Sequence, residues 1–365
     1  MAETRNGLLT EEFISHPGDT LLELLEQYGV SQKELAVKTE TSEKHINEII
    51  KGKKNISVSF AKKLENVLPP DVSFWINRQA IYDEKMETLK IKNNITKEEK
   101  DMIKKFPMKE LEQYGYISTN DNDVDKVLKL RKFCSISDLR LVEAALNVMS
   151  FSVAFKMDNT SKEVDPYRLY SWLRMCQIET ESIHNPNYYD IAKLKESLEE
   201  IKKCSLLSDS KEAYLKVVDI LYGCGINFKI VRNLKSTPVQ GYIKTLNDKI
   251  SLCVTLKWHY EDVFWFTLFH EIGHLLQRRN NKIFIDFDDE ENANEFAKNY
   301  LISKSSYDAL VKGEINEERI LKCAKDNNIS PSIVIGRMKK EGIINYDDTR
   351  FNHLQKKIEW QEVCY

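Results

Sequence analysis

The sequence lacks any apolar run near the roughly 20 residues that a helix needs to cross a bilayer, and its first residues lack the apolar core of a secretory signal. Its seven cysteines are odd in number, scattered, and never spaced as Cys-x-x-Cys, which argues against a disulfide framework and against a thiolate zinc site. The net charge of −3 excludes a chain that is basic throughout, so any contact with nucleic acid must come from a local patch. These absences predict a cytoplasmic protein without a membrane anchor.

Glycine and proline are also scarce, with 12 and 8 among 365 residues, and long stretches carry helical periodicity. After Gly223 the sequence pattern changes from helical periodicity to strand-like composition, because three short segments there are rich in β-branched residues. They predict strands at Ile226–Val231, Val239–Ile243 and Lys249–Val254. Two long helices are expected after them, over about residues 261–278 and 290–302. The expected fold class is mainly α with a small β-sheet (α+β).

The length is too great for one small domain, and the order of the segments predicts four parts. Residues 1–86 hold short helices joined by turns. Residues 87–206 form a helical spacer, in which residues such as Trp172 are expected in a core rather than in a ligand site. Residues 207–347 carry the strands and the long helices, and residues 348–365 form a polar tail.

The most informative segment is His270-Glu-Ile-Gly-His274. On a helix, residues i and i+4 lie about 5–6 Å apart on one face, so two imidazoles can converge on one metal ion. Glu271 is next to the first ligand and can reach a water activated by the metal, which is the position of a general base. The alternative is a pair of surface histidines on an ordinary helix. The apolar residues around the motif argue against it, because buried polar groups need partners.

A zinc site that performs hydrolysis needs a third protein ligand and an open fourth position. The downstream acids that could supply the third ligand are Asp286, Asp288, Asp289, Glu290, Glu291 and Glu295. Glu290 shares a helical stripe with Ala293 and Ala297, whose small side chains let that helix approach the histidine helix closely. Asp288 and Asp289 fit better as acids favoured by the helix dipole. Glu290 is therefore the expected third ligand.

Three segments together resemble the ImmA/IrrE family of zinc metallopeptidases, over about residues 208–346. They are His270-Glu-Ile-Gly-His-Leu-Leu, Glu290-x-x-Ala-Asn-x-Phe-Ala297, and Asn328-Ile-Ser-Pro-Ser-Ile-Val-Ile-Gly-Arg337. The resemblance implies a zincin-like domain in which His270, His274 and Glu290 bind Zn²⁺ and Glu271 is the catalytic base of peptide hydrolysis. A donor for the oxyanion is also expected. Four residues could supply it, and the sequence does not choose among Tyr242, His259, Tyr300 and Arg337.

The N-terminal part carries a second pattern. Leucines between residues 21 and 25 give one helix an apolar face, and Ser31-Gln-Lys-Glu34 is a capping box that opens a second helix. Ser42 can cap a third helix, which turns three isoleucines inward and ends at Gly52. Two short helices joined by a tight turn predict a helix-turn-helix arrangement.

This arrangement assigns eight residues to DNA binding. Gln32 could hold a phosphate, while the outward face of the third helix would read base edges through Ser42, Glu43, Lys44 and Asn47. Lys51, Lys53 and Lys54 form a modest basic patch, which is adequate for a homodimer on two half-sites. The alternative is a generic helical bundle whose lysines form an ordinary solvated face.

Three segments of this region resemble the HigA-type antitoxins of the Xre helix-turn-helix family, over about residues 12–85. They are His16-Pro-Gly through Leu25, Ser31-Gln-Lys-Glu-Leu-Ala36, and Phe74-Trp-Ile-Asn-Arg-Gln79. Glu40 departs from the pattern, because the family often has glycine at this turn. A left-handed backbone at Glu40 would be strained.

The two resemblances together imply a DNA-binding transcriptional regulator that carries a zinc-dependent endopeptidase. Its expected partners are an operator in double-stranded DNA and a protein substrate, such as a repressor in phage, mobile-element or toxin–antitoxin control, or a toxin. The alternative function is an antitoxin or repressor whose zinc domain is a structural or sensing module without proteolysis. Glu271 favours the enzyme, since zinc retention alone does not need it.

Overall fold

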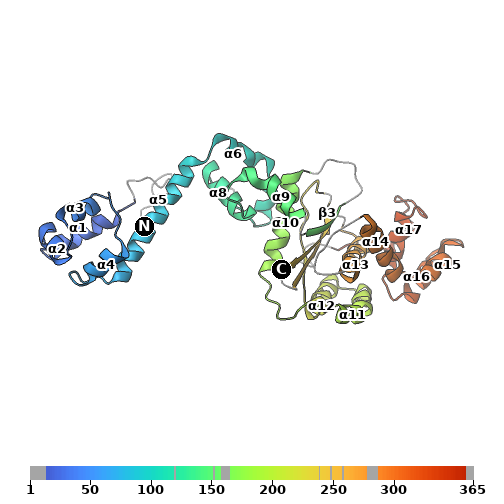
Figure 1. Cartoon of the computed structure of the whole chain (residues 1–365). Helices are drawn as coiled ribbons and strands as arrows, with labels where there is room; N and C mark the ends of the chain where they lie inside the picture. The colour runs from blue at the N-terminus through green and yellow to red at the C-terminus, as the bar shows by residue number, and fades with distance from the viewer. Residues whose placement is uncertain are drawn as a thin grey trace. The chain divides into compact units, whose positions relative to one another are not determined.

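The computed structural model describes residues 14–118, 121–150, 153–157, 165–237, 239–246, 249–256, 259–277 and 287–358. The chain forms two compact units, residues 1–97 and residues 98–365 (Figure 1). Within the described residues, no helix is both long and apolar enough to span a membrane. The six cysteines in this part of the chain are all buried and none forms a disulfide.

The first unit is built from helices that are capped by their own sequence. They are α1 (Pro17–Gln27), α2 (Gln32–Lys38), α3 (Glu43–Ile50), α4 (Val58–Glu65) and α5 (Val72–Asn94). The side chain before each helix accepts a hydrogen bond from a backbone N–H of the first turn, and these caps are His16, Ser31, Ser42, Ser57 and Asp71. Such caps satisfy donors that a helix start leaves without intrahelical partners.

The core of this unit forms where the first three helices meet the start of α5. Leu21, Leu35, Ile46 and Trp75 are completely buried there. Gly18 fixes the contact between α1 and α3, because a Cβ at this position would lie 2.1 Å from the carbonyl oxygen of Ile49. Only glycine therefore fits at the start of α1.

The second unit combines helices with one sheet. Its helices before residue 226 are α6 (Lys97–Met102), α7 (Met108–Gln113), α8 (Asp123–Cys134), α9 (Val142–Ser150), α10 (Pro166–Glu181), α11 (Ile191–Lys203) and α12 (Ser210–Gly223). Those after residue 254 are α13 (Glu261–Gln277), α14 (Phe287–Leu301), α15 (Lys304–Val311), α16 (Glu317–Asp326) and α17 (Pro331–Lys340). Short 3₁₀ turns lie at Ile103–Lys105, Leu139–Leu141, Cys204–Leu206 and Asn352–Leu354.

In the part of the chain that the structure describes, the sheet has four strands in the order β1-β3-β4-β2. They are β1 (Val153–Met157), β2 (Ile226–Ile230), β3 (Val239–Leu246) and β4 (Lys249–Val254). The strand β3 pairs antiparallel with β1 and β4, whereas β2 pairs parallel with β4.

Consecutive residues of β3 show which helix covers which face of the sheet. The position of Gly241 faces α13, because a Cβ there would meet the side chain of Glu271. The ring of Tyr242 lies 6.3 Å from that of Trp172 in α10. Successive side chains of a strand point to opposite faces. The sheet is therefore a layer between α13 and α10.

The expected class, mainly α with a small sheet, is confirmed. The three expected strands are present, and Trp172 is completely buried, as a core residue should be. The fourth strand, β1, was missed, since its segment was interpreted as helical. The domain boundaries expected near residues 206 and 347 stay predictions. The strand β1 and the helix α10, which come before residue 206, belong to the same compact unit as the rest of the sheet.

Candidate metal centre and nucleic-acid interface

Helices α13 and α14 approach each other closely because small residues line their contact. A Cβ at Gly273 would lie 3.2 Å from the Cα atom of Ala293. Ala293 and Ala297 are themselves completely buried. The approach brings a side chain of α14 to the face of α13 that carries the two histidines.

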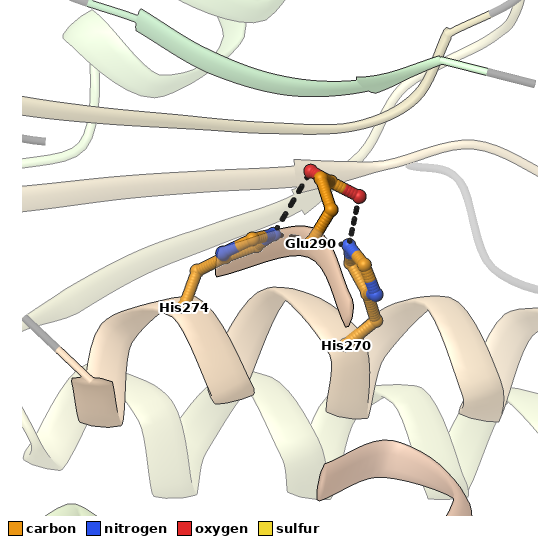
Figure 2. Close-up of side chains that lie close together, drawn as sticks. All are labelled: His270, His274 and Glu290. Carbon is orange, nitrogen blue, oxygen red and sulfur yellow. Dashed lines mark hydrogen bonds and ion pairs between the residues drawn. The ribbon is translucent and has the colours of Figure 1, made fainter. Parts of the chain in front are cut away.

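Three potential ligands converge at this contact. Figure 2 shows the carboxylate of Glu290 directed at both imidazoles, with Oε2 3.4 Å from His270 Nε2 and Oε1 3.3 Å from His274 Nε2. The two Nε2 atoms are 3.0 Å apart. His270 is fully buried, and the side chain of Glu290 is 30% exposed, so the cluster lies at the edge of the core.

The geometry of this cluster fits a zinc ion. Ligand atoms about 2.0–2.1 Å from a tetrahedral zinc are about 3.3 Å from one another, close to the separations seen here. The set of two imidazoles and one carboxylate also matches a hydrolytic zinc site with an open fourth position. Burial by itself raises the pKa of the Glu290 carboxyl, but the contacts with both histidines bring it well below its usual value. A carboxylate that stays ionised is suited to binding a cation.

Asn294 orients the first histidine and was not assigned a role from the sequence. Its Oδ1 atom lies 3.0 Å from His270 Nδ1. Because a carboxamide oxygen only accepts, the proton is placed on Nδ1, and the lone pair of Nε2 then faces Glu290. The sequence did contain a signal for this role, because Asn294 follows Glu290 by four residues and therefore lies on the same face of α14 as the expected third ligand.

Glu271 lies on the sheet side of α13. It is 1% exposed, and a Cβ at Gly241 would lie only 2.0 Å from its Oε1 atom. The absence of a side chain at Gly241 thus creates the space for this carboxylate. Glu271 is consequently held between α13 and β3, one residue along the chain from His270.

The other acids considered as the third ligand do not join the cluster in the described part of the chain. Glu291 and Glu295 are exposed, and Glu295 contacts Lys298 and Asn299 instead. Asp286 and the side chains of Asp288 and Asp289 lie outside the described residues.

Three of the four oxyanion candidates are placed away from the cluster. Tyr242 points to the opposite face of the sheet, against Trp172. Arg337 donates to the carbonyl oxygens of Lys298 and Ile302 at the end of α14, and Tyr300 is in the same turn. At 1.5 Å per residue, that turn is about 12–18 Å from Glu290 along the helix. The ring of His259 lies 3.4 Å from the carbonyl oxygen of Ile358.

In the first unit, α2 and α3 have the starts that the sequence predicted. The hydroxyl oxygen of Ser31 accepts a hydrogen bond from the N–H of Glu34, and that of Ser42 accepts one from the N–H of His45. The carboxylate of Glu34 lies 2.8 Å from Lys38 rather than closing a capping box. Gly52, with φ of 67°, follows the end of α3.

The residues assigned to DNA binding lie on the accessible surface of this unit. Ser42, Glu43 and Lys44 are exposed at the start of α3, and the three lysines of the patch (Lys51, Lys53 and Lys54) are exposed after its end. Gln32 and Asn47 are partly buried and contact each other, with Asn47 Nδ2 3.4 Å from Gln32 Oε1. One charge of the patch is offset, because Lys54 pairs with Glu48 at 2.7 Å.

The turn between α2 and α3 has the strain expected at Glu40. Its φ is 48°, in the left-handed region where a side chain costs free energy. The turn nevertheless closes, since the N–H of Thr41 donates to the carbonyl oxygen of Ala36 at 2.9 Å.

Comparison with known proteins finds relatives of the first unit. The family described as helix-turn-helix matches residues 21–71. Virulence-associated protein I of Dichelobacter nodosus is 36% identical over 72 residues, which are 20% of this chain and 67% of that protein. A solved structure, Pseudomonas aeruginosa antitoxin HigA with higBA promoter, is 26% identical over 23% of this chain and 97% of that chain, with a TM-score of 0.21. The family match includes α2 and α3 in full.

Proposed function

Because the chain belongs, through residues 21–71, to the helix-turn-helix family, we propose that it is a DNA-binding transcriptional regulator whose second unit is a zinc-dependent endopeptidase. The observation that carries the enzymatic part is the convergence of His270, His274 and Glu290. The DNA-binding part rests on the family match and on the exposed start of α3. The resemblance of the second unit to the ImmA/IrrE peptidases supports the same reaction.

In the first unit, α3 would enter the major groove with its N-terminal end. Lys44 would contact DNA there, and Asn47 would read a base edge. The contact with Gln32 holds Asn47 in place between α2 and α3. Two copies on two half-sites would compensate for the modest charge of one patch.

In the second unit, His270, His274 and Glu290 would hold the metal. Zinc at this position supplies a Lewis acid that polarises a scissile carbonyl and makes water acidic near neutral pH. The Glu271 carboxylate would accept a proton from the attacking water and deliver it to the leaving amine. Asn294 would keep the proton of His270 on Nδ1 throughout.

The DNA-binding part is tested with a duplex that the full chain selects from a random library. Asn47→Ala should weaken binding to that duplex by about 1–3 kcal/mol, because a base contact is lost. Lys44→Ala should weaken binding to all duplexes by a similar factor. It should also reduce the slope of the logarithm of the binding constant against the logarithm of the salt concentration by about one, because one phosphate contact is lost. Lys62→Ala is the control, since Lys62 is exposed on α4, where it pairs with Glu65. Wild-type affinity in both α3 variants would show that another surface reads DNA.

The enzymatic part is tested by incubating the protein with a peptide library, which is made by digesting a bacterial proteome. Mass spectrometry then detects the new N-termini that cleavage creates. Wild-type protein and Glu291→Gln should generate the same new N-termini, whereas Glu271→Gln should retain zinc and generate none. Zinc-loaded wild-type protein that cleaves nothing would instead favour the alternative, a repressor or antitoxin whose metal centre is structural or senses a signal.

A further inference from the structure

A groove follows the outer edge of β2 in the second unit. The strand stands at one end of the sheet, and within the described residues it pairs only with β4. The groove has a volume of about 530 Å³ and is lined by the whole strand, by Tyr214 and Tyr222 of α12, and by Glu179 of α10. A strand edge is therefore accessible between two helices.

The backbone of β2 directs hydrogen-bonding groups into this groove. The N–H of Val231 donates to the carbonyl oxygen of Val254 in β4 at 2.9 Å. Because backbone groups of successive strand residues point to alternate sides, Phe228 and Ile230 direct theirs away from β4. Such an edge is a template for another strand, and main-chain hydrogen bonds would hold an extended peptide there.

The polar lining of the groove favours an acidic occupant with hydrogen-bond donors. Asn227 is 7% exposed, and its Oδ1 atom has no hydrogen-bond partner among the described residues. Lys229 and Arg232 also line the groove. The one acid among the described lining residues, Glu179, already accepts a hydrogen bond of 2.6 Å from Tyr116.

The described chain leads to one end of this groove. Ile358 lies with Ile230 and Tyr214 around a small neighbouring cavity, and the latter two residues also line the groove. The sequence continues after Ile358 as Glu-Trp-Gln-Glu-Val-Cys-Tyr, residues 359–365, which lie outside the described residues. Seven residues can span about 23 Å when extended, whereas the five residues of β2 extend about 16 Å.

We propose that the groove along β2 binds an extended segment by strand addition, and that residues 359–365 of this chain are its occupant. The segment carries two acids, Glu359 and Glu362, which complement Lys229 and Arg232. It also contains Trp, Val and Tyr, which are enriched in strands. A segment that continues from Ile358 and enters beside Ile230 would run antiparallel to β2. The metal centre uses none of these residues, so the proposal stands independently of the peptidase activity.

Hydrogen exchange of individual amides tests the proposal by comparing the full chain with a variant that ends at Ile358. The amides of Phe228 and Ile230 should exchange at least about tenfold faster in the shortened protein, because their hydrogen-bond acceptors are removed. Adding the synthetic peptide Glu-Trp-Gln-Glu-Val-Cys-Tyr should restore the slow exchange. The amide of Leu252 in the central strand β4 should stay protected in every sample, which shows that the sheet is intact.

A matched pair of full-length variants tests the backbone contribution separately. Glu362→Pro removes a backbone N–H from the added strand, so the amides of Phe228 and Ile230 should exchange faster. Glu362→Ala keeps that N–H and should leave their exchange slow. Equal protection in the full and shortened chains would overturn the assigned occupant and indicate that another segment or a second copy covers the edge. Fast exchange of Phe228 and Ile230 in both proteins would show that the edge is bare and would also overturn it.

Discussion

Asn294→Ala should weaken zinc binding without removing a ligand. The 3.0 Å contact between Asn294 Oδ1 and His270 Nδ1 fixes both the tautomer and the orientation of the imidazole. Loss of such an outer contact usually lowers metal affinity about 10–100-fold, which corresponds to about 1.4–2.7 kcal/mol. Asn294→Asp keeps an acceptor at this position and should retain most of the affinity.

The assay is a titration of metal-free protein with zinc in the presence of a chelator of known affinity. Asn299→Ala is the matched control, because Asn299 is the same residue type on the same helix and donates to Glu295 instead. If Asn294→Ala and Asn299→Ala bind zinc equally well, the imidazole of His270 is oriented by other contacts and the reasoning is refuted.

Three further predictions concern other parts of the molecule. Gly241→Ala should abolish peptide cleavage but leave the zinc content unchanged, because the new Cβ would lie 2.0 Å from Glu271 Oε1 and must displace that carboxylate; cleavage at the wild-type rate would contradict this. Asp262→Asn should raise the free energy of unfolding at pH 7.5 by about 1–3 kcal/mol and change it little at pH 4, as measured by chemical denaturation. The reason is that burial raises the pKa of the Asp262 carboxyl from 3.8 to about 6, so the wild type loses stability as the pH rises through this interval. Glu40→Gly should stabilise the first unit by about 0.5–1 kcal/mol in thermal unfolding by relieving the left-handed strain, whereas Glu40→Ala should give no such gain.

Features encoded within a few residues could be predicted from the sequence. The caps Ser31 and Ser42 depend on a hydrogen bond to a residue three positions later, so a short pattern identifies them. The shared face of His270 and His274 follows from helical spacing alone. Glu290 required one further step, the argument that Ala293 and Ala297 allow two helices to approach.

Features that depend on distant pairing could not be predicted in this way. The strand β1 was missed because it forms by pairing with β3, more than 80 residues later in the chain, and strand preference depends strongly on such context. The space for Glu271 likewise depends on a glycine in β3, some 30 residues earlier. Only the packed structure shows what the missing side chain of Gly241 permits.

The central claim is that His270, His274 and Glu290 form a zinc site in a DNA-binding regulator. The most direct test is the zinc content per chain of protein purified without chelators, measured beside Glu290→Gln and its neighbour control Glu291→Gln. The account predicts one zinc per chain in the wild type and in Glu291→Gln, and little in Glu290→Gln. A wild type without zinc, or equal zinc in all three proteins, would contradict it and leave the helix-turn-helix unit as the functional part of the chain.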